Sequence, residues 1–300
     1  MNIREIEAAL EEGNSLKAIA QAYSEIANIK IKKIRADVEQ NRIFFQEISQ
    51  IYTLIKQLAF QKKISIVKQK KMICMILTSN YRFYGSINSD LLEFFVNTVR
   101  KLNADHIYLG KAAIEYFRAA PLESGKIQLP FQDAVKEVLL KSDQPDTDEL
   151  LMLTNLLKDY NQILIFYSNM KSLLVQVPTI MDLTSSSSPL ADPSTHELTE
   201  KQENGKTGNE LTKFIFEPEL PKILQFFNSQ VITLLLEGAF LESELSRTAS
   251  RFISMDQAET EANKFIKQYQ TNKAYAKRNM DNNTILENFA AMTATRKEIQ

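Results

Sequence analysis

Residues 14–61 read NSLKAIAQAYSEIANIKIKKIRADVEQNRIFFQEISQIYTLIKQLAFQ, a stretch without glycine or proline. Apolar side chains recur at helical spacing, which predicts one amphipathic helix with a seam close to that of a coiled coil. Asn14 or Ser15 can cap its start. At 1.5 Å per residue this helix would be about 70 Å long. The expected buried seam is Leu16, Ile19, Tyr23, Ile26, Ile34, Val38, Phe45, Ile48, Tyr52 and Ile55.

The other end of the chain repeats this pattern. The last proline is Pro221 and the last glycine is Gly238, so residues 221–300 are predicted to form a second long helix. Neither helix can bury its apolar stripe alone, and the two are expected to wind around each other as an antiparallel coiled coil. The expected second stripe is Leu241, Leu245, Phe252, Met255, Phe265, Tyr269, Ala276, Met280, Leu286 and Phe289.

The middle of the chain is predicted to be a small Rossmann-like α/β domain. Residues 72–77 (MICMIL) form a continuous apolar run, typical of a strand buried on both faces. The domain boundaries are placed at 1–65, 66–220 and 221–300, the first and last being the coiled-coil helices. Further strands are expected at 106–109, 163–167, 172–177 and 213–216, helices at 91–102, from 114 onward and at 150–160, and a mobile loop at 182–210, which is rich in Ser, Thr, Pro and charge.

Composition excludes several classes of protein. The 300 residues carry a net charge of −1, unlike the strong basicity of a nucleic-acid binder, and no nucleic-acid partner is expected. Cys74 is the single cysteine and lies in the expected strand core, and His106 and His196 are the two histidines. We therefore expect neither a disulfide, nor a metal site, nor a cofactor.

Two other features bear on location and rival functions. The N-terminus lacks the apolar core of a secretory signal, and no run of 18 apolar residues occurs, so direct membrane insertion is not expected. A nucleotide-binding enzyme is disfavoured because neither G-x-x-x-x-G-K-[ST] nor G-x-G-x-x-G is present. A coiled-coil scaffold or tether with an α/β spacer stays open as the alternative, to be separated by its choice of partner.

Several segments are similar, in order along the chain, to the gamma subunit family of F-type ATP synthases. Residues 78–89 (TSNYRFYGSINS) resemble that family's SSDRGLCGGFN stretch and keep Ser79, Gly85 and Asn88. Arg82 and Ser86 replace family glycines, so this loop must tolerate strain or adopt another conformation. The other similar segments are 17–33 (KAIAQAYSEIANIKIKK), 107–117 (IYLGKAAIEYF), 214–218 (FIFEP), 246–256 (SRTASRFISMD), and 270–274 (QTNKA) with 285–287 (ILE).

Tyr23 and Glu25 stand at methionine positions of the family, which suggests a divergent bacterial member, with an N-type ATPase as one possibility. The resemblance implies a non-catalytic rotor shaft whose coiled coil stands inside a hexamer of alpha and beta subunits. Its α/β domain would sit on the ring of c subunits beside epsilon. It also implies one copy per complex, and a peripheral place on the cytoplasmic face of the bacterial inner membrane.

The resemblance also indicates contact residues, each with a plainer structural alternative. The basic candidates for stator contact could simply be solvated helix faces, and the apolar ones are expected to be seam or sleeve residues. Phe216 and Glu217 match the family position that contacts the c ring and epsilon, or are a strand end before proline. The stator candidates are Tyr23, Ile26, Lys30, Lys32, Lys33, Arg35, Lys273, Lys277, Arg278, Ile285 and Phe289, with Tyr275 alongside.

Overall fold

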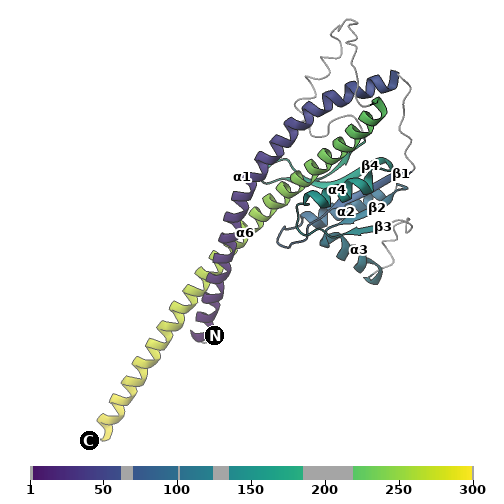
Figure 1. Cartoon of the computed structure of the whole chain (residues 1–300). Coiled ribbons are helices and arrows are strands. Elements are labelled where there is room, and N and C mark those ends of the chain that lie inside the picture. The colour runs from purple at the N-terminus through teal and green to yellow at the C-terminus, as the bar shows by residue number, and fades with distance from the viewer. Residues whose placement is uncertain (1–2, 62–69, 101, 124–134, 185–218, 299–300) are drawn as a thin grey trace. The chain divides into compact units, whose positions relative to one another are not determined.

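The structure is a computed structural model that describes residues 3–61, 70–100, 102–123, 135–184 and 219–298. It divides into two compact units. Unit 1 is Met1–Asn28 with Arg251–Gln300, and unit 2 is Ile29–Ser250. The elements are α1 (Ile3–Gln61), β1 (Lys70–Leu77), α2 (Ile87–Val99), β2 (Asp105–Leu109), α3 (Lys111–Glu123), β3 (Val135–Val138), α4 (Thr147–Leu157), β4 (Tyr160–Met170), β5 (Gln176–Asp182) and α6 (Leu220–Glu298) (Figure 1).

Unit 2 contains a five-stranded sheet in the order β3-β2-β1-β4-β5. Four strands are parallel, and β5 pairs with β4 in the antiparallel direction. In the register of the sheet, Cys74 of β1 faces His106 of β2 and Leu164 of β4. The helices α2, α3 and α4 each follow a parallel strand, which is the arrangement of a small Rossmann-like domain.

Alternate residues of β1 divide the core into two layers. Ile73, Met75 and Leu77 pack into a cluster with side chains of α1, α4 and α6. Cys74 and Ile76 face the opposite side and pack with α2 and α3. Because both faces of the sheet are covered, β1 is apolar throughout residues 72–77, as the sequence predicted.

The two long helices pair in antiparallel fashion within each unit. In unit 2, Tyr52 of α1 donates a hydrogen bond to Asn228 of α6 (2.6 Å). In unit 1, Gln21 of α1 donates to Glu259 of α6 (2.7 Å). A second contact in each unit gives the direction: Arg42 pairs with Glu242 in unit 2, and Glu7 pairs with Lys273 in unit 1. In each unit, residue numbers therefore rise along one helix as they fall along the other, and the antiparallel pairing predicted from the two apolar stripes is confirmed.

One part of α6 is apolar enough to resemble a membrane span. An 18-residue window within Leu220–Met292 has a mean hydropathy of 1.3, and half of that window is buried inside the protein. Val231, Leu235 and Phe240 belong to the core cluster beneath the sheet. A helix covered by a sheet passes the same test of length and composition, and this burial accounts for the apolar character of the segment.

Several predicted boundaries were wrong. The first helix begins at Ile3 rather than at residue 14, because Gly13 lies inside the helix. The strand predicted at 172–177 is instead Gln176–Asp182, and Leu174 lies in the preceding turn with its side chain exposed. The strand Val135–Val138 was missed. The predicted strand at 213–216, and residues 185–210 of the predicted loop, lie outside the described residues.

Candidate functional site

Unit 1 buries a seam of small residues. On α1 the buried positions are Ile6, Gly13, Ala20 and Ala27, spaced seven residues apart. A Cβ atom built on Gly13 would lie 3.0 Å from Cδ1 of Phe265 and 3.1 Å from Cγ1 of Ile266. The side chains of Phe265 and Ile266 therefore pack directly against the backbone of α1 at Gly13, which has no side chain to separate them.

The large apolar residues of unit 1 face outward instead. Leu16, Ile19, Tyr23 and Ile26, which the sequence placed in the seam, are all exposed. The prediction failed because size was taken as a sign of burial, whereas smaller residues occupy the seam, Ala20 directly after Ile19 and Ala27 directly after Ile26. On α6 the exposed members of this surface are Tyr275, Met280, Ile285, Leu286, Phe289 and Met292, so Ile285 and Phe289 are not seam residues either.

The basic candidates differ in their surroundings. Lys273 forms an ion pair with Glu7 (2.8 Å), and Lys30 lies 3.8 Å from Glu244. The guanidinium of Arg251 lies 6.0 Å from the centre of the Tyr23 ring. Within the described ranges, no ion pair involves Lys32, Lys33, Arg35, Lys277 or Arg278, and all five are exposed. These five are therefore the basic candidates that face solvent in the chain alone.

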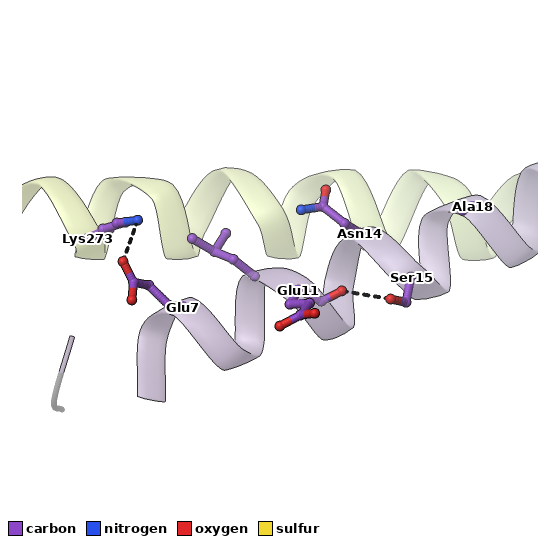
Figure 2. Close-up of a pocket in the computed structure, with 7 residues that line it drawn as sticks. Glu7, Glu11, Asn14, Ser15, Ala18 and Lys273 are labelled. Atoms are coloured by element: carbon purple, nitrogen blue, oxygen red, sulfur yellow. Dashed lines mark hydrogen bonds and ion pairs between the residues drawn. The ribbon is translucent and has the colours of Figure 1, made fainter. Parts of the chain in front are cut away.

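A groove with a volume of about 510 Å³ lies between α1 and α6 in unit 1 (Figure 2). The Glu7–Lys273 ion pair sits at one end, and Ser15 donates to the backbone carbonyl of Glu11 (2.9 Å). The groove has no histidine, no cysteine and no nucleophile with an adjacent base, so its chemistry is that of a polar helix surface. Its lining residues are Glu7, Leu10, Glu11, Asn14, Ser15, Ala18 and Lys273.

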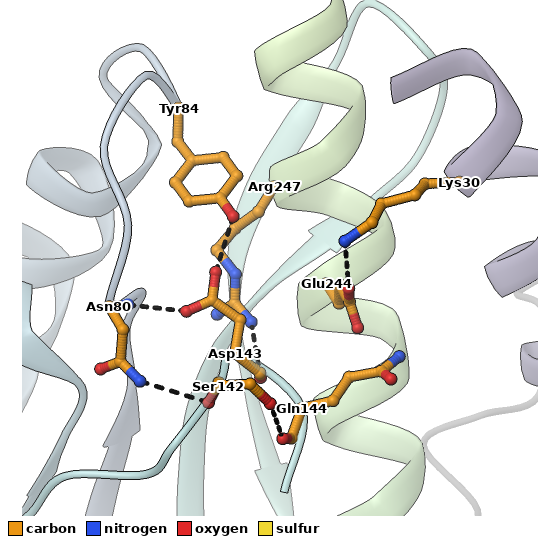
Figure 3. A network of polar contacts seen from close by, with 8 residues as sticks. All are labelled: Lys30, Asn80, Tyr84, Ser142, Asp143, Gln144, Glu244 and Arg247. Carbon is orange, nitrogen blue, oxygen red and sulfur yellow. Dashed lines mark hydrogen bonds and ion pairs between the residues drawn. The ribbon is translucent and has the colours of Figure 1, made fainter. Parts of the chain in front are cut away.

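A buried polar network in unit 2 joins the α/β domain to α6 (Figure 3). Asp143, in the loop before α4, accepts hydrogen bonds from the Asn80 N–H (2.7 Å) and the Tyr84 hydroxyl (2.6 Å). Arg247 of α6 donates to the backbone carbonyl of Asp143 (3.3 Å). Ser250 of α6 donates to the backbone carbonyl of Tyr84 (2.7 Å). We call Asn80, Tyr84, Asp143, Arg247 and Ser250 the α6 joint.

A second buried contact holds α6 from another direction. Glu242 forms an ion pair with Arg42 of α1 (2.9 Å) and accepts a hydrogen bond from the Tyr167 hydroxyl of β4 (3.1 Å). Burial, together with the nearby Glu242 carboxylate, raises the pKa of Tyr167. Burial also raises the pKa of Glu244, against the opposing charges of Lys30 and Arg247. The segment of α6 that crosses this region is thus polar although it is buried.

The loop after β1 is strained at one residue, but at neither of the positions, Arg82 and Ser86, where family glycines are replaced. Phe83 has φ 68°, a left-handed conformation that costs a bulky residue about 1–2 kcal/mol. Ser86 has φ −83°, so the second replaced glycine requires no special conformation here. Gly110 has φ 95°, and a Cβ at that position would lie 2.3 Å from the carbonyl oxygen of Thr78. Only glycine fits where β1 and β2 end side by side.

Parallel α/β sheets usually bind ligands where neighbouring strands lead in opposite directions, which in this sheet is between the carboxyl ends of β1 and β4. Here α6 itself contacts that edge, through Ser250 at the loop after β1 and Glu242 at β4. The described residues contain no group of three metal-ligating side chains. Phe216 and Glu217, the candidates for contact with the c ring and epsilon, lie outside the described residues.

Residues 2–280 match the ATP synthase family. The chain therefore belongs to the ATP synthase family. Relatives that it matches include the ATP synthase gamma chains of Staphylococcus epidermidis (21% identity, 88% of this chain and 89% of the relative), Mycoplasma mycoides (23%, 86% and 86%) and Bacteroides fragilis (23%, 89% and 90%).

Solved structures share the fold. The rotor of the Euglena gracilis mitochondrial ATP synthase covers 93% of this chain and 98% of its own, with a TM-score of 0.57 and 15% identity. A chain from the central stalk and c-ring structure of the Tetrahymena thermophila mitochondrial ATP synthase covers 80% and 99%, with a TM-score of 0.53 and 19% identity. These likenesses support the predicted fold class of two long terminal helices around a small α/β domain.

Proposed function

We propose that this chain is the central rotor shaft, the gamma subunit, of an F-type ATP synthase. It transmits torque between a membrane ring of c subunits and a catalytic hexamer of alpha and beta subunits. The observation that carries the proposal is the family match over residues 2–280, together with antiparallel pairing of the terminal helices in each unit. A paired helix is stiffer than a single one because each helix braces the other along the buried seam.

In this role the chain is a non-catalytic subunit of a complex that makes or hydrolyses ATP coupled to ion transport. Its partners are the alpha, beta, epsilon and c subunits, with one copy per complex. It reaches the cytoplasmic face of the bacterial inner membrane through these partners. The exposed apolar surface of unit 1 supports the proposal, because a surface rich in Ile, Leu, Phe and Met is typical of a protein–protein contact.

The stator contacts follow from which candidates face outward. Tyr23, Ile26, Ile285 and Phe289 are proposed to contact the inner surface of the hexamer through apolar packing. Lys32, Lys33 and Arg35 are proposed to face acidic loops, where complementary charge sets register more than affinity. Lys277 and Arg278 extend this charged contact along α6. Lys30 and Lys273 contribute less, since each already has an acidic neighbour within the chain.

Coexpression with the alpha and beta subunits tests the proposal. The expected result is a complex with one copy of this chain, in which ATP hydrolysis turns a probe fixed to it. Self-association of the chain, with no binding to the hexamer, would instead favour the tether.

The proposed contact surface has its own matched pair of variants. Ile285→Glu places a charge on the apolar surface and is expected to lower the yield of complex or its hydrolysis rate. Asn282→Glu, an exposed position on the same helix, is expected to leave both unchanged. Equal behaviour of the two variants would remove Ile285 from the contact.

A further inference from the structure

We propose that the α6 joint fixes the rotational position of α6 against the α/β domain, so that the domain and the helix turn as one body. The proposal rests on the rotor function above and assigns positioning residues to it. All five members, Asn80, Tyr84, Asp143, Arg247 and Ser250, lie in unit 2, and each contact named below is within that unit.

Asp143 is the centre of the joint. It is 7% exposed, and both of its carboxylate oxygens accept hydrogen bonds from the loop after β1, one from the backbone of Asn80 and one from the hydroxyl of Tyr84. Its backbone carbonyl accepts from Arg247. One residue thus connects the end of β1, the loop before α4 and the helix α6.

The loop after β1 is itself held rigidly. The side-chain amide of Asn80 donates to the backbone carbonyls of Leu140 (2.9 Å) and Ser142 (3.2 Å), and its oxygen accepts from the backbone N–H of Lys111 (3.0 Å). Force applied through α6 at Arg247 or Ser250 therefore reaches the ends of two strands and not a loose loop. The strained backbone at Phe83 is retained between these fixed points.

The composition of α6 points the same way. A helix segment buried on all sides is normally apolar, yet Glu242, Ser243, Glu244, Ser246, Arg247 and Thr248 are all buried. Buried polar contacts are poor sources of stability compared with apolar packing, but they have direction and can specify one arrangement. This segment therefore favours a defined rotational setting of the helix over maximal stability.

Two anchors in different directions are needed to stop a helix from turning or sliding. Glu242 and Arg247 are five residues apart, which separates them by about 140° around the helix and about 7.5 Å along it. Glu242 is held by β4 and α1, and Arg247 by the loop before α4. With both in place, neither rotation about the axis nor displacement along it leaves all the contacts intact.

The assembled complex with the alpha and beta subunits tests this joint. The hexamer is fixed to a surface, and a nanorod is attached to α3 through Glu115→Cys, since the natural Cys74 is buried. The angular variance of the rod is recorded while the motor pauses. The variants are Arg247→Met and Ser250→Ala, and the matched control is Tyr81→Phe, which removes a hydroxyl from an exposed tyrosine of the loop after β1.

Two hydrogen bonds of the joint cross from α6 to the α/β domain, one donated by Arg247 to the backbone carbonyl of Asp143 and one by Ser250 to the backbone carbonyl of Tyr84. Each of the variants Arg247→Met and Ser250→Ala removes one of them, so if the two bonds act as equal parallel springs the angular variance rises roughly twofold in either variant and stays unchanged in Tyr81→Phe. Equal variance in both variants and the control overturns the joint.

Failure of the rotor function is distinguishable from failure of the joint. A wild-type chain that neither binds the hexamer nor turns would refute the function.

Hydrogen exchange in the full chain tests the contacts without the complex. The Asn80 N–H is expected to exchange at least about tenfold faster in Asp143→Ala than in Tyr81→Phe. An equal rate in both variants shows that Asp143 does not hold this loop, and overturns the joint as well.

Discussion

Replacing Arg42 alone by methionine is expected to destabilise unit 2 far more than replacing Arg42, Glu242 and Tyr167 together by apolar residues. The side chain of Glu242 is 4% exposed and that of Arg42 is 29% exposed. In Arg42→Met the carboxylate keeps the Tyr167 hydroxyl but loses its ion-pair partner inside the protein. Breaking a buried ion pair by removing one partner costs about 3–5 kcal/mol, and partial exposure of Arg42 places this case near about 3 kcal/mol.

The reverse replacement should cost less. Glu242→Gln leaves Arg42 partly hydrated and keeps an oxygen that accepts from Tyr167, so about 1–2 kcal/mol is expected. The triple variant Arg42→Met, Glu242→Met and Tyr167→Phe removes all three members of this contact together. It should lie within about 1 kcal/mol of the natural chain, because apolar residues of similar volume often replace buried ion pairs without loss.

Urea denaturation of the full chain, followed by circular dichroism, measures these free energies of unfolding. The reasoning is refuted if Arg42→Met costs less than about 1 kcal/mol, or if the triple variant is less stable than Arg42→Met. Either result would mean that solvent, and not the ion pair, stabilises the Glu242 carboxylate.

Three further outcomes are expected. Burial raises the pKa of Cys74 from 9.0 to about 12, so its thiolate fraction at pH 8 should be about a thousandfold lower in the folded chain than in urea. A thiol reagent that labels the folded and the urea-unfolded chain at similar rates would contradict this burial. Burial, opposed by Asp105, lowers the pKa of His106 below 6.5. The unfolded chain then binds the proton more readily than the folded chain, so the free energy of unfolding falls as the pH drops below 6.5. His106→Phe should therefore reduce the change in urea midpoint between pH 7.5 and pH 5.5. An unchanged pH dependence in this variant would assign the effect to another group. Gly13→Ala should be neutral or stabilising, because the higher helix propensity of alanine, about 1 kcal/mol, offsets a tight contact that the Phe265 ring can relieve by moving. Gly13→Leu should weaken the pairing of α1 with α6 by about 1–3 kcal/mol, measured by hydrogen exchange of residues 3–28. Equal protection in both variants would show that α6 does not pack tightly against Gly13.

The strand with the strongest local signal was predicted correctly, since the apolar run 72–77 lies within β1. The helix predicted at 150–160 is α4 at Thr147–Leu157; its start is set by the capping residue Asp146 with Glu149, a local signal that the prediction did not use. The strand β3 gave no such signal because it is short, lies at the sheet edge and exposes Val135, Lys136 and Glu137. The strand β5 contains Pro178, which an edge strand tolerates, while the more apolar residues before it form the turn.

The site was less predictable than the fold. Which large apolar residues of α1 face outward depends on how closely α6 approaches, and a single helix pattern does not contain that distance. The α6 joint connects residues far apart in sequence: Asn80 is 63 positions from Asp143, and Arg247 is 104 positions from it. Asn80, Asp143 and Arg247 were not selected from the sequence, because a polar residue shows no sign of its partner until the chain is folded.

The outward-facing apolar residues of unit 1 have a consequence for how the protein must be produced. A copy whose Ile285, Phe289 and neighbouring apolar side chains contact no other subunit presents an exposed apolar surface to the solvent. Synthesis together with a subunit that covers these side chains, or retention by a chaperone, would keep such copies from precipitating. Overproduction of the chain alone should accordingly give inclusion bodies more readily than joint production does.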